Sequence, residues 1–227
     1  MITPIKNACN NKQYDAIRLL LEHGAHVQDA MLECLSVCRI ADIDMITVLL
    51  DHGYDPNSDI VYTYGKILPL HLAISCNNTK LVKLLITYNA NINISDGSWT
   101  PLEVACRYNR ISIFKYLLKK GAHVDSSKDN LLNCACDSST KHILFDYILD
   151  NKLGTPTIHT LEQTIRSNNT YCMYVLLDMG IDPNILQRGE MIRLSSRINV
   201  DNILNILGRY GATGLKTKNR GMCITRA

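Results

Sequence analysis

The stretch TPLEVACRYNRISIFKYLLKKG, residues 100–121, decides the fold because the chain repeats its pattern. TPIKNACNNKQYDAIRLLLEHG at 3–24 and LPLHLAISCNNTKLVKLLITYN at 68–89 align with it without gaps. Four weaker copies extend the series to seven, at a period of roughly thirty residues. Such a period predicts a stacked array, in which each repeat buries its apolar face only against its neighbours.

Each copy has a reference position that is mostly occupied by a small residue. The reference residues are Ala8, Val37, Ala73, Ala105, Ala135, Thr164 and Ser195. An apolar residue precedes each of them by three positions, and leucine pairs such as Leu20/Leu21 and Leu117/Leu118 follow by twelve and thirteen. The copy around Ala135 needs one extra residue near Ser138 to keep this register.

This column pattern predicts two helices in every repeat. The first segment is short and rich in small residues, and the second has apolar residues at helical spacing. Thr3-Pro4 and Thr100-Pro101 predict an N-cap followed by proline at the first helical position. Gly or Asn ends the second helix, as a left-handed C-cap requires, at Gly24, Gly53, Asn89, Gly121, Gly180 and Gly211.

These motifs resemble ankyrin repeats. The Thr-Pro-Leu-His-x-Ala signature of that family is matched by residues 68–73 and 100–105, and the end of its second helix by residues 19–27 and 117–125. The resemblance covers about residues 1–213. It implies an all-α ankyrin-repeat solenoid of about seven helix-turn-helix units, joined by short or irregular β-hairpin fingers.

We therefore expect one ankyrin-repeat domain over residues 1–213. Its approximate repeat bounds are 1–29, 30–65, 66–97, 98–127, 128–156, 157–187 and 188–213. The last repeat is predicted to be a terminal cap, because Asp201 and Gly208 replace apolar residues at its outer positions. Residues 214–227 are basic with little apolar pattern, so we expect a flexible tail.

Composition favours a soluble intracellular protein. The net charge of +3 and the lack of any run of five basic residues give little support for nucleic-acid binding. No stretch approaches the eighteen apolar residues of a membrane span, and Met1 leads directly into the first repeat, without room for a signal peptide. We expect a monomer in the cytoplasm, with the nucleus as the alternative.

The nine cysteines are predicted to pack as small apolar residues. Cys9, Cys38, Cys106 and Cys136 directly follow a reference residue, where the family usually has a second small residue. A metal- or redox-dependent protein using the Cys and His set is the alternative from another class. Cys34-x3-Cys38 and Cys134-x-Cys136 lack the second ligand pair of a zinc site, so we expect no metal and no cofactor.

The histidines have structural interpretations. His23 and His52 directly precede a capping glycine, where an imidazole can reach the last carbonyls of the helix. His71 occupies the signature position of the family, and the resemblance implies a hydrogen bond from its ring between adjacent turns.

The sequence offers no catalytic constellation. It lacks a nucleophile beside a base, a glycine-rich phosphate loop and paired carboxylates at usable spacing. The three glycines of Gly208–Gly214 follow a predicted helix and not a strand. We expect no catalytic residues and no small-molecule substrate.

The resemblance implies that a partner protein binds the concave face, formed by the fingers and the first helices. Trp, Tyr and Arg are enriched at binding hot spots. Trp99, the sole tryptophan, precedes the first helix of its repeat, so it either binds a partner or covers the stack between the third and fourth repeats. The candidate partner-binding residues are Tyr62, Tyr64, Trp99, Arg107, Tyr108, Arg39 and Arg166.

These features predict a non-enzymatic protein-protein interaction module. The second interpretation is an adaptor that recruits a target to a larger host complex such as a ubiquitin ligase. The abundance of Asn and Ile and the irregular repeats also resemble ankyrin proteins of large DNA viruses. Asn57, Asn93 and Asn184 lie in the fingers, where asparagines of ankyrin proteins resemble substrates of an intracellular asparagine hydroxylase.

Overall fold

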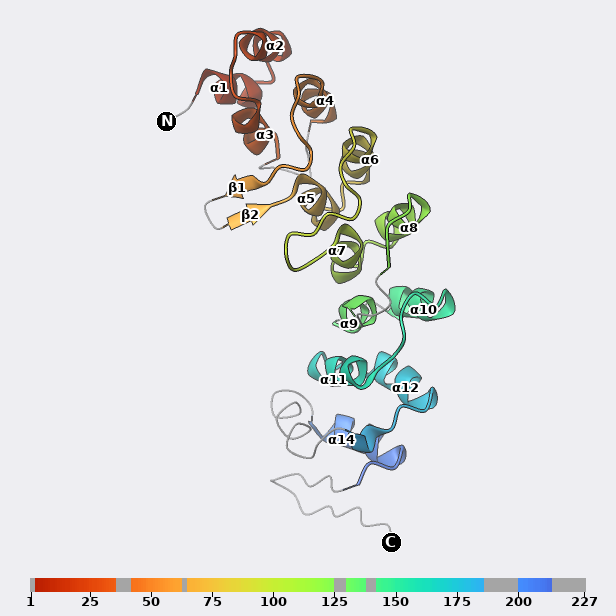
Figure 1. The fold of residues 1–227 in the computed structure, drawn as a ribbon. Coiled ribbons are helices and arrows are strands. Elements are labelled where there is room, and N and C mark those ends of the chain that lie inside the picture. The colour runs from red at the N-terminus through yellow and green to blue at the C-terminus, as the bar shows by residue number, and fades with distance from the viewer. Residues whose placement is uncertain are drawn as a thin grey trace. The chain divides into compact units, whose positions relative to one another are not determined.

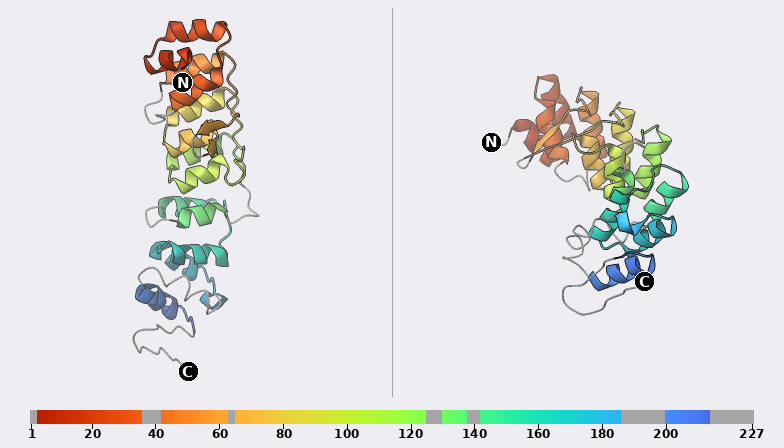
Figure 2. Two further views of the ribbon diagram at one scale, coloured as in Figure 1. Left: turned by 90° about the vertical axis from the view of Figure 1, so that its left-hand side faces the viewer. Right: turned by 60° about the horizontal axis from the view of Figure 1, so that its bottom comes forward.

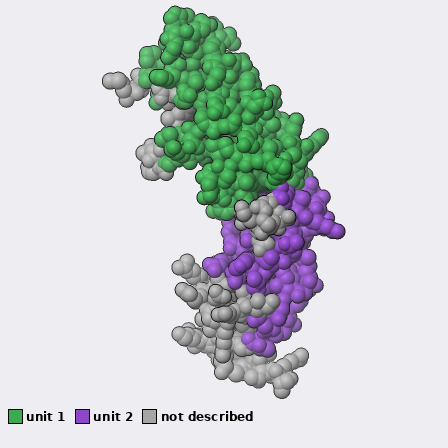
Figure 3. Space-filling model, in the orientation of Figure 1, with its two compact units in different colours: residues 1–123 green, residues 124–227 purple. Residues whose placement is uncertain are grey.

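The computed structural model describes residues 3–35, 42–62, 65–124, 130–137, 142–185 and 200–213. Paired α-helices dominate these residues (Figure 1), as the all-α prediction required. The chain forms two compact units, Met1–His123 and Val124–Ala227 (Figure 3). They are called unit 1 and unit 2.

Unit 1 contains four helix pairs and a hairpin. The pairs are α1 (Pro4–Asn10) with α2 (Tyr14–Glu22), α3 (Val27–Leu35) with α4 (Ile43–Asp51), α5 (Pro69–Ser75) with α6 (Thr79–Thr87), and α7 (Pro101–Arg107) with α8 (Ile111–Lys119). The antiparallel strands β1 (Ile60–Tyr62) and β2 (Gly65–Ile67) form a finger between α4 and α5, with Ile60 opposite Ile67. Within unit 1 the second helices lie in one layer and the first helices in another (Figure 1, with further views in Figure 2).

Unit 2 continues the same pattern. Its elements are α9 (Asn130–Cys136), α10 (His142–Asp150), α11 (Ile158–Arg166), α12 (Thr170–Asp178), the 3-10 helix η2 (Pro183–Ile185) and α14 (Val200–Arg209). The seventh reference residue, Ser195, lies outside the described residues, as does the predicted tail at 214–227.

Small reference residues let neighbouring first helices approach closely. Ala73, Ala105, Ala135 and Thr164 are completely buried, and Ala8 is nearly so. The Thr164 hydroxyl donates to the carbonyl of Leu161 at 2.7 Å, so its burial leaves the hydroxyl satisfied.

The cysteines that follow the reference residues pack as predicted. Cys9, Cys106 and Cys136 are buried. Cys38 lies outside the described residues, as does the reference residue Val37.

The turn between the two helices repeats with the same hydrogen bond. The N–H five positions after the reference residue donates to the reference carbonyl, as from Asn78 to Ala73 at 2.9 Å and from Arg110 to Ala105 at 2.8 Å. The residue just before that N–H has a left-handed backbone, as at Asn77 (φ 59°) and Asn109 (φ 55°). This is the bond that ends a helix in a Schellman motif, so the turn satisfies a carbonyl that would otherwise be exposed.

A residue with a left-handed backbone also follows the second helix of a repeat, as predicted. Every predicted capping residue within the described part of the chain has a positive φ, between 64° at Asn89 and 89° at Gly180. In the fifth repeat Lys152 takes this position with φ 53°. The rings of His23 and His52 also reach helix carbonyls as expected, with Nδ1 at 2.8 Å from Leu19 O and 2.7 Å from Val48 O.

Asparagine side chains join successive repeats beside these helix ends. Asn57 accepts from the N–H of Asn91 at 2.6 Å and donates to the carbonyl of Asn89 at 3.3 Å. Asn93 accepts from the N–H of His123 at 2.8 Å. In unit 2, Asn184 holds the backbone after α14 in the same way. Each of these amides therefore fixes the backbone of the following repeat.

Tyrosine hydroxyls form a second set of bonds between repeats. The Tyr14 hydroxyl donates to Asp42 at 2.7 Å, and this bond with the carboxylate raises the pKa of Tyr14 to about 12. The other pairs of this kind are Tyr88 with Asp51, Tyr171 with Asp146, and Tyr210 with Asp178.

We expect Lys152→Gly to stabilise the protein by about 0.5–1 kcal/mol, because glycine adopts a left-handed backbone without the steric cost of a Cβ. Gly180→Ala, at the equivalent cap of the next repeat, is expected to cost about 1 kcal/mol. No atom lies within 4 Å of the Cβ that the alanine adds, so the cost comes from the backbone. Urea unfolding of both variants measures these changes. Equal stability of the two would contradict the backbone explanation.

We expect Asn57→Ala to destabilise unit 1 by about 1–2 kcal/mol, because two hydrogen bonds between repeats are lost. Asn57→Asp keeps the acceptor for the Asn91 N–H and loses only the donor, so its loss is expected to be smaller. Chemical denaturation of the two variants beside the natural chain gives the comparison. The hypothesis fails if aspartate costs as much as alanine.

Candidate protein-binding surface

A tight turn at residues 96–99 fixes the backbone of Trp99. The Asp96 carboxylate accepts from the N–H of Ser98 at 2.9 Å and of Trp99 at 2.8 Å. The Asp96 N–H donates to the Trp99 carbonyl at 3.3 Å. Gly97 supplies the left-handed backbone inside the turn, with φ 93°. Trp99 is thus held at the end of a short, hydrogen-bonded loop.

The start of α7 fixes the same segment from the other side. The side chain of Thr100 caps the helix, accepting from the N–H of Glu103 at 3.4 Å, and Glu103 accepts from the Thr100 N–H at 2.7 Å. These reciprocal bonds form a capping box, with Pro101 at the first helical turn as predicted. The backbone of Trp99 therefore lies between the hydrogen-bonded turn at Asp96 and the capping box of α7.

Arg107 lies over the ring of Trp99. Its guanidinium carbon is 5.0 Å from the centroid of the indole ring, a distance typical of a cation–π contact. Arg107 is exposed in the last turn of α7, Trp99 is half-buried, and the adjacent Tyr108 is 48% exposed. We call Trp99, Arg107 and Tyr108 the tryptophan patch.

The turn is also linked to the preceding repeat through His71. The side chain of His71 is 3% exposed, and its Nδ1 lies 3.4 Å from an Asp96 carboxylate oxygen. Within the described residues neither ring nitrogen makes a hydrogen bond, so the expected bond is replaced by a longer electrostatic contact.

The pKa values of this pair follow from their surroundings. Burial lowers the pKa of His71, and the nearby Asp96 carboxylate only partly opposes that effect. Partial burial raises the pKa of Asp96, but the N–H groups of Trp99 and Ser98 together with His71 outweigh it. The pKa of Asp96 therefore lies below its ordinary value.

The other candidate residues fall elsewhere. Arg166 is exposed at the end of α11 in unit 2. Arg39 and Tyr64 lie outside the described residues, and Tyr62 belongs to β1 with its side chain also outside them. The structure therefore brings two of the seven candidates into contact, Trp99 and Arg107, and a third, Tyr108, directly follows Arg107 and is exposed.

In the ranges that the structure describes, no three His, Cys, Asp or Glu side chains gather as ligands for a metal ion. None of the helices described is long and apolar enough to cross a membrane.

Comparison with known proteins identifies the repeats. A family model for three copies of the ankyrin repeat matches residues 34–128. The chain is 29% identical over 163 residues to ankyrin repeat protein nuc-2 of Neurospora crassa. The aligned region covers 66% of this chain and 15% of nuc-2. It is 28% identical over 202 residues to the putative ankyrin repeat protein FPV031 of fowlpox virus. That alignment covers 81% of this chain and 56% of the viral protein.

The fold is also that of a solved ankyrin domain. The crystal structure of the human ASB11 ankyrin repeat domain superposes with a TM-score of 0.65 at 16% identity, over 94% of this chain and 100% of that domain. The helix pairs, the signature residues and these similarities show ankyrin repeats over residues 34–128 and the ankyrin-repeat fold for the chain. It spans 15% of nuc-2 and 56% of FPV031.

We expect the free energy of unfolding to decrease as the pH falls from about 7 to 5. Unfolded histidine binds a proton near its ordinary pKa of 6.5, whereas folded His71 binds it only at lower pH. The unfolded state therefore takes up more protons in this range, and acid favours it. His71→Gln cannot titrate and should show a weaker pH dependence in urea unfolding. Parallel curves for the two proteins would assign the dependence to other groups.

Proposed function

We propose that the chain is a non-catalytic module that binds another protein, and that the tryptophan patch is the centre of its binding surface. Ankyrin repeats are generally protein-protein interaction modules. The observation that supports this site is the stacking of an exposed arginine on Trp99, whose backbone is held by Asp96 and the α7 cap.

The energetic advantage of this patch is its preorganisation. An arginine side chain loses about 2 kcal/mol of rotamer freedom when it is fixed completely. Contact with Trp99 already restricts the rotamers of Arg107 in the unbound protein. Less side-chain entropy is therefore lost when a partner binds. The indole and the Tyr108 ring add apolar area with polar edges, which suits a protein surface. The patch therefore has the composition of a binding hot spot.

The alternative for Trp99 is that it covers the stack between the third and fourth repeats. Its half-buried ring is compatible with some covering. One face of the ring, however, lies under the guanidinium of Arg107, which is itself exposed. We therefore assign Trp99 to the binding surface.

We expect Trp99→Ala/Arg107→Ala to abolish capture of the specific partner from a cell lysate. Loss of a hot spot costs at least about 2 kcal/mol, or roughly 30-fold in affinity. Affinity capture with mass spectrometry identifies the partner, and calorimetry with the purified partner measures the loss.

Leu19→Ala is the matched control, because Leu19 is 57% exposed on α2, outside the patch. Circular dichroism should show unchanged helicity for both variants, since the substituted side chains lie at the surface or half-buried. If the double variant captures the same proteins as the control with equal affinity, the assignment of the patch is wrong.

A further inference from the structure

Exposed positions on the second helices of unit 1 differ in charge along the unit. They are acidic in α2 and α4, whereas lysines occur among them in α6 and α8. Two exposed positions recur on each of these helices, seven and fourteen residues after the reference residue. In α2 and α4 they are acidic, namely Asp15, Glu22, Asp44 and Asp51. In α6 and α8 they are Lys80, Thr87, Ser112 and Lys119. The same structural positions are therefore all acidic in the first two repeats and either basic or uncharged in the third and fourth.

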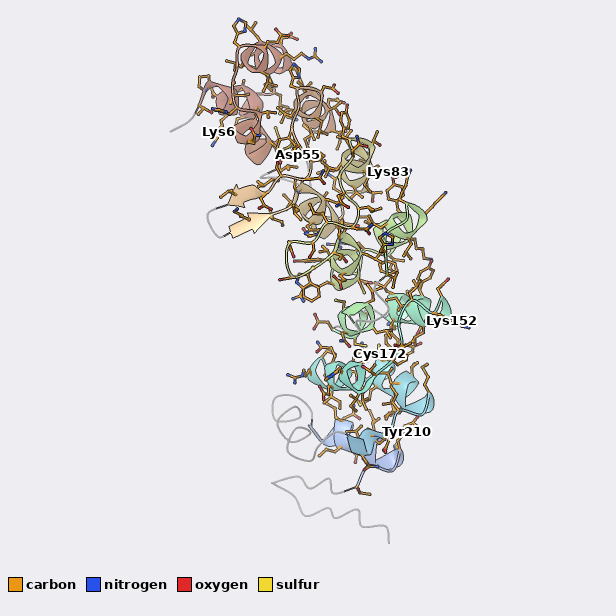
Figure 4. The ribbon with its side chains drawn as sticks, in the orientation of Figure 1. Lys6, Asp55, Lys83, Lys152, Cys172 and Tyr210 are labelled. Atoms are coloured by element: carbon orange, nitrogen blue, oxygen red, sulfur yellow. The ribbon has the colours of Figure 1, made fainter. Side chains whose placement is uncertain are left out.

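The basic half contains further lysines. Lys83 in α6, Lys115 in α8 and Lys120 directly after α8 are also exposed. Neither α6 nor α8 contains an Asp or Glu. We call Lys80, Lys83, Lys115, Lys119 and Lys120 the outer lysine cluster, and Figure 4 marks Lys83 on α6.

The ring of Tyr116 draws lysines of two successive repeats together. The Lys83 ammonium lies 5.7 Å from its centroid and the Lys120 ammonium 5.9 Å. Both are within cation–π range, so the ring lowers the cost of holding two like charges close together. Lys80, Lys83 and Lys119 form no ion pair with any residue that the structure describes. These three lysines thus present positive charge that the described residues of the unit do not neutralise.

We propose that the outer lysine cluster binds an acidic segment of a partner protein. A nine-residue helix is about 13 Å long, and packed helices lie about 8–10 Å apart. The cluster therefore suits a segment with four or five carboxylates within roughly 15 Å, either one acidic helix face or a short extended run. Complementary charge at such a surface mainly increases the association rate and excludes wrong partners.

Two features favour an acidic protein segment over a nucleic acid. The acidic positions of α2 and α4 lie on the same layer as the cluster, so an anionic strand extending along the layer would meet their carboxylates. A short acidic segment avoids them. In addition, Tyr116 is half-buried and already contacts Lys83 and Lys120, so it does not offer a free ring for base stacking.

The cluster is separate from the tryptophan patch. Its lysines lie on or next to second helices, whereas Trp99 precedes a first helix and Arg107 and Tyr108 lie at its end. The two surfaces are therefore tested independently.

The test uses the full chain and a fluorescein-labelled peptide of about ten glutamates, with binding followed by fluorescence anisotropy at about 50 mM salt. Lys83→Glu/Lys119→Glu should weaken binding about tenfold, and Lys83→Gln/Lys119→Gln by less, because it removes charge without reversing it. Arg18→Glu/Lys66→Glu is the matched control. It changes the net charge by the same amount at exposed positions outside the cluster and should alter the affinity by less than about twofold.

Two results would overturn the proposal. One is an equal loss of affinity in the cluster and control variants, which would mean that only net charge matters. The other is tighter binding of a single-stranded DNA of about ten nucleotides than of the peptide, with the same dependence on the cluster, which would assign the surface to nucleic acid. Circular dichroism of every variant verifies that the fold is kept.

Discussion

The structure depends on one constraint, which is that a single helix pair cannot bury its own apolar face. Each repeat must lean on its neighbours, and close approach of the first helices requires a small side chain where they meet. Ala73 and Ala105 in unit 1, and Ala135 and Thr164 in unit 2, meet this requirement and are fully buried. Larger residues at these positions would push the first helices apart and expose the leucines of the second helices.

The stacking requires the chain to reverse direction twice in a repeat, and left-handed residues make these reversals wherever the structure describes them. Asn77 and Asn109 are examples between the helices, and Gly121 and Gly180 are examples after them. Glycine and asparagine tolerate this backbone best, which explains why the sequence pattern at these positions is so regular. Lys152 shows that the stack imposes the conformation even on a residue that does not favour it.

Because the repeat pattern uses a fixed set of positions for packing and turns, the remaining positions are free for recognition. The tryptophan patch and the outer lysine cluster occupy such positions on the two different helix layers of unit 1. Both surfaces contain a cation–π contact. Trp99 contacts Arg107 of the same repeat, whereas Tyr116 contacts Lys83 of the preceding repeat and Lys120 of its own. The same architecture therefore provides two chemically distinct surfaces.

The sequence by itself determined the ankyrin fold, the helix pairs, the caps at Thr100 and Gly121, and the burial of cysteines such as Cys106. These features depend on residues close together in the chain or on a periodic pattern, both of which are visible without coordinates. Only the tertiary structure decided which side chains meet across repeats. The asparagine bridges, the contact of His71 with Asp96 and the lysines around Tyr116 join residues about 25–37 positions apart. No run of basic residues indicates the lysine cluster, because the stacking of successive repeats brings its members together.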